Sequence, residues 1–243
     1  MCTVSYIPLQ SSVFLSSNRD EKKFRSIAIH PEEYEHSSGK MIYPKDPDAG
    51  GTWIAAHETG NAIVFLNGAR HKHESMPPYR LSRGIVLLDM LNHHSPVYRF
   101  NEIELTSIEP FTAVIYEQQR LFQARWDGKE KELLSLDPLQ RHIWSSCTLY
   151  TDDVIEKRQR WFKEWNSFHE HPSEQDITGF HLFTGDGDEW NDLRMNRDGV
   201  TFTVSVTTME ISAEKVFMQY HDLRNGRVSG RILRCSQNMV LRS

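Results

Sequence analysis

The sequence predicts an α+β fold in which two antiparallel sheets are covered by helices. Strand-like and helix-like segments come in blocks, in the order strands, helix, strands, helices, strands, which fits this fold better than alternating βαβ units. The composition, with 38% hydrophobic and 25% charged residues, is that of a folded globular protein. A chain of 243 residues can bury one sizeable core, so we expect a single domain spanning residues 1–243.

Two hairpins are expected in the first part of the chain. Residues 3–7 and 13–17 carry β-branched and aromatic side chains on either side of a polar break. Residues 52–57 and 62–66 form the second pair, and the apolar run of 62–66 indicates a strand buried on both faces. Between the hairpins, residues 31–51 are rich in Pro, Gly, Ser and Asp and are expected to form a long functional loop.

A helix is expected after the second hairpin. Apolar residues recur at helical spacing over residues 81–91, with Ser82 near the start, and Pro96 marks the end. The next segments are typical of strands, because they are separated by turn-like polar residues. These expected strands cover residues 111–116, 120–126 and 132–136.

The last part of the chain predicts two helices followed by strands. Residues 152–168 carry an apolar stripe at helical spacing and begin with two aspartates, where negative charge suits the helix dipole. Residues 173–184 form the second helix, with Ser173 as its cap and Gly185 as its stop. The closing strands are expected at residues 200–208, 215–220 and 231–234.

The composition excludes several classes of protein. Lys and Arg number 28 against 33 Asp and Glu, a net charge of −5, which argues against a nucleic-acid binder that relies on overall positive charge. The longest apolar runs fall far short of the roughly 20 residues that a membrane span needs, and the start lacks the pattern of a signal peptide. Three cysteines indicate free thiols in a reducing compartment, so we expect a cytoplasmic protein. The 12 histidines show no recognised metal-ligand spacing, and we expect no metal or cofactor.

Cys2 directly follows the initiator methionine. A small residue at this position generally allows the methionine to be removed, which would leave a thiol and a free α-amine on one residue. An α-amine has a pKa of about 7.7–8.0, so much of it is neutral near physiological pH and can accept the thiol proton. The pattern predicts an N-terminal nucleophile. An incidental cysteine is the alternative that position alone leaves open.

Asn18, Arg19, Asp20 and Glu21 follow a strand that is expected to pair with the first strand of the chain. We expect a sharp turn here that brings an amide, a guanidinium and two carboxylates close to the terminus. Such groups could hold an α-amine and balance charge around a thiolate. The alternative is a solvated, charged turn.

These motifs, in this order, resemble the NRDE family, also called the transport and Golgi organisation 2 family. The resemblance rests on the Met-Cys start, the Asn-Arg-Asp-Glu tetrapeptide, Gly-Gly-Thr-Trp-Ile at 50–54, Leu66-Asn67 and Ser-Arg-Gly at 82–84, and it spans most of the chain. The family is similar to N-terminal nucleophile hydrolases of the choloylglycine hydrolase and penicillin V acylase type. The resemblance therefore implies a four-layer αββα sandwich.

The resemblance also implies roles for individual residues. Cys2 matches the nucleophile, and Asp20 and Asn18 match positions that contact the terminal amine or the nucleophile. Arg19 belongs to the tetrapeptide, whereas the hydrolases place their arginine slightly earlier. Asn67 matches an asparagine of the oxyanion hole, where an amide N–H suits a developing oxyanion. Because glycine follows it, Asn67 also fits a turn dipeptide.

Two features depart from those hydrolases. Relatives carry an asparagine in a Ser-Asn segment before the first helix of the second half, and Cys147 stands in its place. A thiol is a poor replacement for an amide donor. The hydrolases also use an arginine on a late strand, and residues 203–208 contain none. These departures weaken the expectation of amide hydrolysis and leave the expected fold intact.

Two functions from different classes are therefore expected. In the first, the protein is an amidohydrolase: Cys2 attacks a linear non-peptide amide, the α-amine shuttles the proton, and Asn67 with a backbone N–H binds the oxyanion. In the second, the same fold is a non-catalytic binding or trafficking protein for a small apolar ligand, haem or lipid, as the family resemblance implies. The expected partner is thus a small-molecule amide or an apolar ligand, with no nucleic acid and no membrane span.

Overall fold

The structure, a computed structural model, describes residues 3–236. Within these residues it contains two antiparallel sheets of seven strands each. The first sheet has the order β10-β1-β2-β12-β13-β14, with β11 paired to β12. Its strands are β1 (Thr3–Pro8), β2 (Ser12–Lys22), β10 (His142–Ser145), β11 (Asn196–Arg197), β12 (Thr201–Ser212), β13 (Lys215–Asp222) and β14 (Val228–Arg234).

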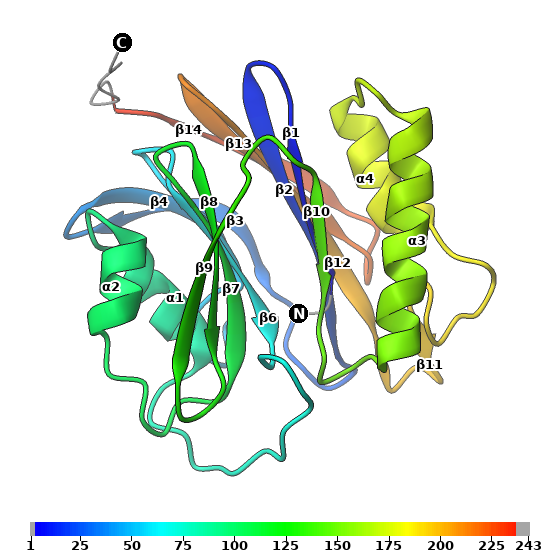
Figure 1. Ribbon diagram of the computed structural model, residues 1–243, viewed down its shortest axis with the longest axis horizontal. Coiled ribbons are helices and arrows are strands. Elements are labelled where there is room, and N and C mark those ends of the chain that lie inside the picture. The colour runs from blue at the N-terminus through cyan, green and yellow to red at the C-terminus, as the bar shows by residue number, and fades with distance from the viewer. Residues whose placement is uncertain (1–2, 237–243) are drawn as a thin grey trace.

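The second sheet follows the chain order from β3 to β9 (Figure 1). Its strands are β3 (Ile29–His36), β4 (Gly39–Lys45), β5 (Ile54–His57), β6 (Ala62–Asn67), β7 (Phe111–Glu117), β8 (Arg120–Trp126) and β9 (Lys131–Leu136). Every predicted strand is confirmed, with ends shifted by a few residues.

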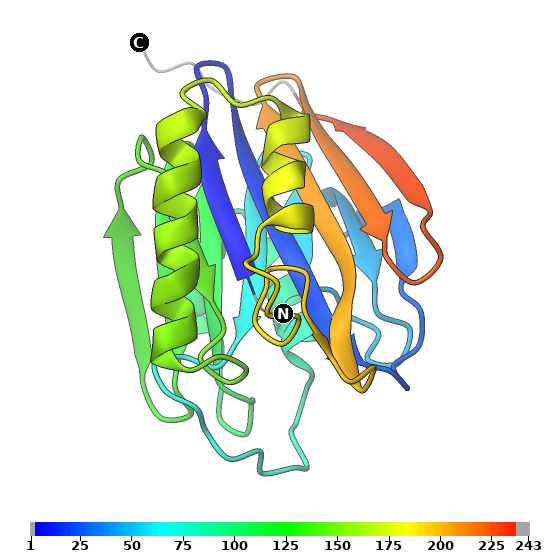
Figure 2. The same ribbon diagram turned by 90° about the vertical axis from the view of Figure 1, so that its right-hand side faces the viewer.

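Helices cover the outer faces of both sheets. The described helices are α1 (Arg83–Leu91), α2 (Pro96–Glu102), α3 (Asp152–Phe168) and α4 (Glu174–Phe183). α1 and α2 pack on the second sheet, and α3 and α4 pack on the first, as Figures 1 and 2 show. The inner faces of the sheets share a hydrophobic core that includes Val4, Leu15, Val64, Val114 and Met209. The order helix, sheet, sheet, helix confirms the predicted α+β fold with four layers.

Side-chain alternation along β1 explains its place in the middle of the molecule. Val4 and Tyr6 are fully buried between the two sheets, whereas Thr3 and Ser5 face α3 and α4. All four side chains are inaccessible to solvent. A strand buried on both faces fixes its register firmly, so the start of β1 has a defined position.

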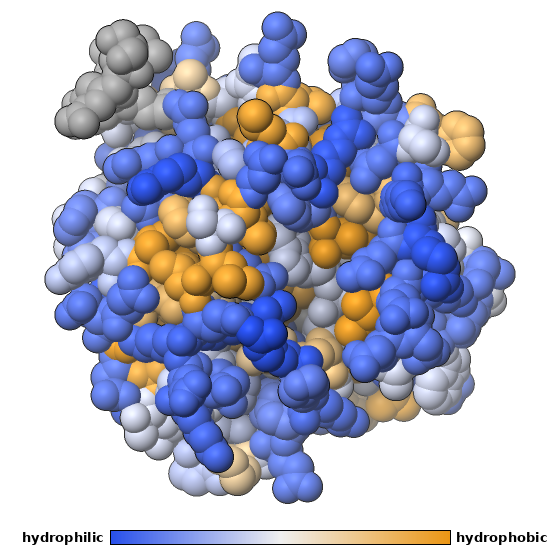
Figure 3. All heavy atoms as spheres, viewed as in Figure 1, coloured by the Kyte–Doolittle hydropathy of each residue, from blue (hydrophilic) through white to orange (hydrophobic). Residues whose placement is uncertain are grey.

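The helix starts follow the predicted caps. α1 begins after Ser82, whose hydroxyl accepts the Ile85 N–H at 3.3 Å. α4 begins after Ser173, which forms a capping box with Asp176. α3 turns a charged face to solvent, which appears as the hydrophilic surface on the right of Figure 3.

The prediction of a loop at residues 31–51 is wrong, because most of β3 and all of β4 form a hairpin there. Tyr34 of β3 stacks on Tyr43 of β4, with ring centroids 4.2 Å apart, while Glu35 points to solvent near Lys40. β3 lies at the edge of the sheet, and only one of its eight residues is buried. Its composition is therefore polar enough to resemble a loop.

The sharp turn expected at residues 18–21 is also wrong. β2 continues to Lys22 because β1 and β12 pair with its two edges. Strand alternation therefore sends Asn18 and Asp20 to the face under α3 and α4, and Arg19 to the space between the sheets.

Two short elements lie outside the predicted pattern. Pro96 ends the first helical pattern as expected, but it is also the first residue of α2, where proline suits a helix start. β10 is a four-residue edge strand whose side chains are all half-buried. Its pairing with β1 becomes visible only in three dimensions.

Candidate functional site

Residues from both sheets meet at the beginning of β1. Cys2, the candidate nucleophile, lies outside the described residues. Thr3, the next residue, is fully buried and pairs with Asn18 of β2 and with the last residue of β10. Ser146, directly after β10, donates its hydroxyl at 2.8 Å to the Asn67 carbonyl at the end of β6. This hydrogen bond joins the end of β6, in the second sheet, to the residue that follows β10, the strand beside β1.

Asp20 is a buried carboxylate held by two hydroxyl groups. Its Oδ2 accepts the Tyr150 hydroxyl at 2.6 Å, and its Oδ1 accepts the Thr203 hydroxyl at 2.6 Å. Thr203 Oγ1 in turn accepts the Met195 N–H at 2.9 Å, which orients the hydroxyl toward Asp20. Short hydrogen bonds of this kind stabilise an ionised carboxylate. The site therefore contains a fixed negative charge close to the start of β1.

The side chain of Asn18 is fully engaged beneath α4. Its amide donates to the carbonyls of His181 at 3.0 Å and Leu193 at 2.9 Å, and its Oδ1 accepts the His181 Nδ1–H. His181 Nε2 accepts the hydroxyl of Ser5 at 2.7 Å. Asn18 therefore anchors α4 to the sheet, and its hydrogen-bonding groups are all used inside the protein.

Ser5, His181 and Asn18 have the connectivity of a nucleophile, a base and an orienting residue. All three are inaccessible to solvent, so a substrate has no route to the Ser5 hydroxyl. Burial, with a smaller contribution from the charge of Arg158, lowers the pKa of His181 to about 3. The imidazole is thus neutral at physiological pH, and the network is structural.

Arg19 lies on the other face of β2, between the sheets. Its guanidinium donates to Asp46 Oδ2 at 2.7 Å and lies over the Trp53 ring, 4.4 Å from the centroid. Asp46 follows β4, so this buried ion pair connects the two sheets. Arg19 is 3% exposed, and its position indicates a role in holding the sheets together.

Asn67 ends β6 where the two sheets meet. Its side chain is half-buried, and its amide makes no hydrogen bond to another of residues 3–236. Gly68 follows with a φ of +79°, a left-handed conformation that suits glycine where the chain leaves β6. A Cβ on Gly68 would lie 2.7 Å from Cys147 Sγ, so that thiol lies directly beside the turn. Burial raises the pKa of the Cys147 thiol.

Arg158 of α3 is a site residue that the sequence motifs missed, as are Tyr150, Thr203 and His181. Arg158 is fully buried, and its Nη1 donates to Thr3 Oγ1. Its Cζ lies 3.6 Å from the centroid of the Tyr150 ring, so Tyr150 contacts this buried cation with its ring and the Asp20 carboxylate with its hydroxyl. The signal in the sequence was an arginine within the apolar stripe of α3.

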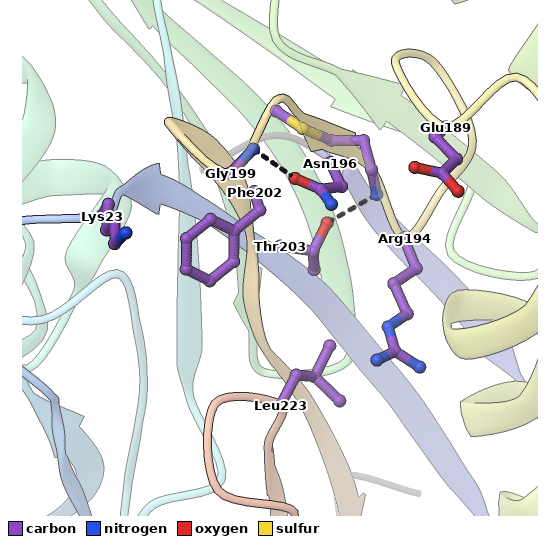
Figure 4. Close-up of a pocket in the computed structure, with 9 residues that line it drawn as sticks. Lys23, Glu189, Arg194, Asn196, Gly199, Phe202, Thr203 and Leu223 are labelled. Carbon is purple, nitrogen blue, oxygen red and sulfur yellow. Dashed lines mark hydrogen bonds between the residues drawn. The ribbon is translucent and has the colours of Figure 1, made fainter.

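A pocket of about 510 Å³ includes Thr203 in its wall (Figure 4). Its other lining residues are apolar (Met195, Phe202, Leu223), charged (Lys23, Glu189, Arg194) or small and polar (Asn196, Gly199). The volume is within the usual range for small-molecule sites. Because Thr203 also donates to Asp20, the pocket wall is hydrogen-bonded to the buried carboxylate.

Metal-binding clusters and membrane-spanning helices were sought only in the part of the chain that the structure describes. No three His, Cys, Asp or Glu side chains of residues 3–236 gather as metal ligands would. None of the helices in that range has the length and apolar character to cross a membrane. Cys147 and Cys235 are free thiols.

In sequence, the profile of the family described as Transport and Golgi organisation 2 matches residues 1–236. No curated protein is significantly similar to the chain in sequence.

Solved structures of hydrolases are similar to the chain in fold. The conjugated bile acid hydrolase from Clostridium perfringens, as its C2A mutant, has a TM-score of 0.57 and 11% identity, and the match covers 98% of both chains. A Caenorhabditis elegans ortholog of N-acylethanolamine-hydrolyzing acid amidase has a TM-score of 0.56 and 10% identity, over 86% of this chain and 92% of that chain. Both have folds of the N-terminal nucleophile hydrolase type, which confirms the expected fold. At such low identities the likeness shows the fold alone.

Proposed function

Since the chain belongs to the Transport and Golgi organisation 2 family and has an N-terminal nucleophile hydrolase-type fold, we propose that it is an amidohydrolase. It cleaves linear non-peptide amides, with Cys2 as the nucleophile after Met1 is removed. One observation carries the proposal: β1 begins at Thr3, beside the buried carboxylate of Asp20 and the end of β6 at Asn67. One of the similar structures is named as a hydrolase of conjugated bile acids and the other as an ortholog of an acid amidase. These two names support the reaction class.

The position of Asn67 supports its role as an oxyanion donor. Thr3, which follows the candidate nucleophile in sequence, pairs with the strand that leads to Ser146, and Ser146 is hydrogen-bonded to the Asn67 carbonyl. The Asn67 amide lies at the end of β6, without a hydrogen bond to any other described residue. The Cys2 thiol attacks the substrate carbonyl carbon and its proton passes to the α-amine. The Asn67 N–H then donates to the developing oxyanion.

The residues of β2 take supporting roles. Asp20 provides a fixed negative charge that favours the protonated α-amine formed during attack. The ammonium then returns the proton to the leaving amine, and water releases the acyl group from sulfur. Asn18 fixes α4 behind β1, and Arg19 fixes the distance between the sheets.

The pocket beside Thr203 has both an apolar and a charged wall, and suits an acyl group that carries a polar substituent. Met195, Phe202 and Leu223 provide its apolar wall.

We place the activity in the cytoplasm. The free thiols of Cys147 and Cys235 support a reducing compartment.

The test combines intact mass with hydrolysis of a panel of N-acyl amides by the full chain. We expect a mass without Met1, and we expect Cys2→Ala to abolish turnover. Cys235→Ala serves as the matched thiol control and keeps the wild-type rate. Asn67→Ala should lower kcat by about 10²–10³ with little change in KM, because an oxyanion donor acts in the transition state. Retained Met1, or an undiminished rate in Cys2→Ala, contradicts the proposal.

The second candidate function is non-catalytic binding of a small apolar ligand, haem or lipid. It is favoured by Cys147, a thiol where the similar hydrolases are expected to carry an amide donor, and by the lack of arginine from Thr203 to Thr208 on β12. In the haem case, Cys2 binds the iron as a thiolate. A haem titration tests this: a spectral shift that Cys2→Ala removes supports it, and identical spectra for both proteins argue against it.

A further inference from the structure

Three side chains have the connectivity of a catalytic triad where the edges of the two sheets meet. Ser229 Oγ lies 2.8 Å from His30 Nδ1, and His30 Nε2 lies 3.5 Å from Asp222 Oδ2. Ser229 belongs to β14 and His30 to β3, which are edge strands of the two sheets, and Asp222 ends β13. A serine, a histidine and a carboxylate in this order are the groups that activate a hydroxyl by general-base catalysis.

The tautomer of His30 follows from its two neighbours. A carboxylate can only accept a hydrogen bond, so Asp222 favours the form of His30 that carries its proton on Nε2. Nδ1 is then left to accept the proton of the Ser229 hydroxyl. The Arg224 N–H and Asn225 Nδ2 each donate to the buried Asp222 carboxylate at 2.9 Å, which fixes its orientation.

An ion pair holds the two edge strands together beside the triad. Arg231 donates to both carboxylate oxygens of Glu32, at 2.9 and 2.8 Å. Arg231 comes two residues after Ser229 on β14, and Glu32 comes two residues after His30 on β3. The His30 ring also packs against the Tyr220 ring, with centroids 4.9 Å apart. A bidentate ion pair and an aromatic contact therefore fix the serine against the imidazole.

The backbone of β14 provides a donor for an oxyanion. The Asp222 N–H donates to the Arg227 carbonyl, and hydrogen-bonded pairs alternate along β13 and β14, so Tyr220 and Ser229 form the next such pair. The Gly230 N–H therefore points away from β13, at the open edge of the sheet. Ser229 is half-buried and Gly230 is exposed, so a small substrate can reach both.

We propose that Ser229 is the nucleophile of a second hydrolytic site, with His30 as general base and Asp222 as the orienting carboxylate, and that this site cleaves small esters with an apolar acyl group. Ile27, which is 54% exposed, and Ala28 line a narrow cleft together with Asp222 and provide apolar surface beside the triad. Esters suit an open site with a single assigned oxyanion donor, because an alkoxide leaves more readily than an amine. The triad is independent of the amidohydrolase proposal, since it uses neither the Cys2 thiol nor Asn67.

The reaction has two halves. Ser229 Oγ attacks the ester carbonyl carbon while its proton passes to His30 Nδ1, the Gly230 N–H donates to the oxyanion, and Asp222 stabilises the imidazolium. The bond to the alcohol oxygen breaks, and the alcohol leaves with the proton from Nδ1. Water then adds to the acyl carbon and gives a proton to Nδ1. The bond to Ser229 Oγ breaks, Oγ takes that proton back, and the carboxylic acid is released.

The chain contains a second contact between a serine and a histidine, which serves as a matched control. Ser38 is exposed, and its Oγ lies 3.1 Å from His57 Nε2. The Thr59 N–H donates to His57 Nδ1 at 3.1 Å, so Nδ1 is an acceptor and the ring proton lies on Nε2, facing Ser38. His57 therefore cannot take the proton of the Ser38 hydroxyl through Nε2, and we expect Ser38 to be unreactive.

The experiment treats the full chain with a fluorophosphonate probe and locates the adducts by mass spectrometry. All proteins carry Cys2→Ala, so that this thiol contributes nothing. We expect an adduct on Ser229 and none on Ser38, and we expect His30→Gln to slow the labelling of Ser229 by about 10²–10⁴, the usual contribution of a general base. Hydrolysis of p-nitrophenyl acetate should fall to the uncatalysed rate in Ser229→Ala and stay unchanged in Ser38→Ala.

Equal labelling of Ser229 and Ser38 overturns the inference, as does undiminished labelling of Ser229 in folded His30→Gln. It is also overturned if the chain does not hydrolyse p-nitrophenyl acetate, or if hydrolysis survives Ser229→Ala. If His30→Gln does not fold, the comparison of the two serines within one folded protein still decides.

Discussion

Tyr150 donates its hydroxyl to Asp20 Oδ2 at 2.6 Å, joining the segment before α3 to the middle of the first sheet across 130 residues of sequence. The same ring carries the guanidinium of Arg158 on its face. One aromatic side chain thus contacts a buried carboxylate through its hydroxyl and a buried cation through its ring. This arrangement fixes α3 against the start of β1, where the candidate nucleophile is attached.

Tyr150→Phe tests this relationship. We expect a loss of about 1–3 kcal/mol in the free energy of unfolding, because a buried carboxylate loses one of its two hydroxyl donors. Urea unfolding measures the loss. Tyr98→Phe is the control, since Tyr98 is 53% exposed and its removal should change stability by less than about 0.5 kcal/mol. In a double-mutant cycle with Asp20→Asn, independent effects of the two substitutions would show that the hydroxyl and the carboxylate are not coupled.

The tautomer of His181 follows from its two hydrogen bonds. Asn18 uses its amide N–H groups on two carbonyls, so its oxygen must accept from His181 Nδ1, and Nε2 is left to accept from Ser5. We expect one histidine of the 12 to show the Nδ1–H tautomer by nitrogen NMR and to keep it between pH 7.5 and 5. His181→Gln should remove that signal. A His181 signal that titrates near 6.5 would contradict the buried network.

The same histidine makes stability depend on pH. The pKa of His181 falls from its usual 6.5 in the unfolded chain to about 3 in the folded protein, because burial disfavours the charged ring. Below pH 6.5 the unfolded chain therefore binds a proton that the folded protein does not. The contribution is fully present above pH 6.5 and is lost as the pH falls toward 3, at roughly 1.4 kcal/mol per pH unit.

Urea midpoints between pH 7 and 4.5 measure this slope. His181→Gln should lower the number of protons taken up on unfolding by about one, which makes the slope smaller. His171→Gln, at an exposed position just before α4, should leave the slope unchanged. Equal slopes for wild type and His181→Gln would assign the acid sensitivity to other groups.

Periodicity predicted most of the fold because burial follows periodicity. α3 buries side chains at helical spacing, and β5 and β6 are apolar runs buried on both faces, so the sequence alone locates all three. This approach missed β3, since β3 is an edge strand in which only one of eight residues is buried. The short strand β10 offers too few residues for any period to appear.

The candidate site was less predictable, since its contacts are distant in sequence. The tetrapeptide is part of strand β2 and is buried at Asn18, Arg19 and Asp20, whereas the prediction of a turn placed all its side chains together. In β2 they alternate, so Asn18 and Asp20 lie under the helices and Arg19 lies between the sheets. Tyr150 and His181 join β2 from 130 and 163 residues away, and no local pattern encodes such partners.

Gly68 determines how closely the end of β6 approaches the segment after β10. Its φ is +79°, and a Cβ there would lie 2.6 Å from Thr148 Cγ2 and 2.7 Å from Cys147 Sγ. Gly68→Ala therefore adds a backbone cost to a steric clash, and we expect a loss of about 2–4 kcal/mol in the free energy of unfolding. Gly226→Ala is the matched control. Gly226 has a φ of +72° with no atom within 4 Å of the added carbon, so only the backbone cost of about 1–2 kcal/mol applies.

The difference between the two alanine variants isolates the clash beside Cys147. Adding Cys147→Ala to Gly68→Ala should recover part of that difference, because it removes the sulfur and leaves Thr148 in place. Urea unfolding of the variants gives the comparison, and labelling of the Cys147 thiol should become faster in Gly68→Ala as the contact opens. Equal losses for Gly68→Ala and Gly226→Ala would mean that the two segments are not in contact. Asn67 would then lose its fixed place beside the start of β1, and with it the geometric basis for an oxyanion donor at this position.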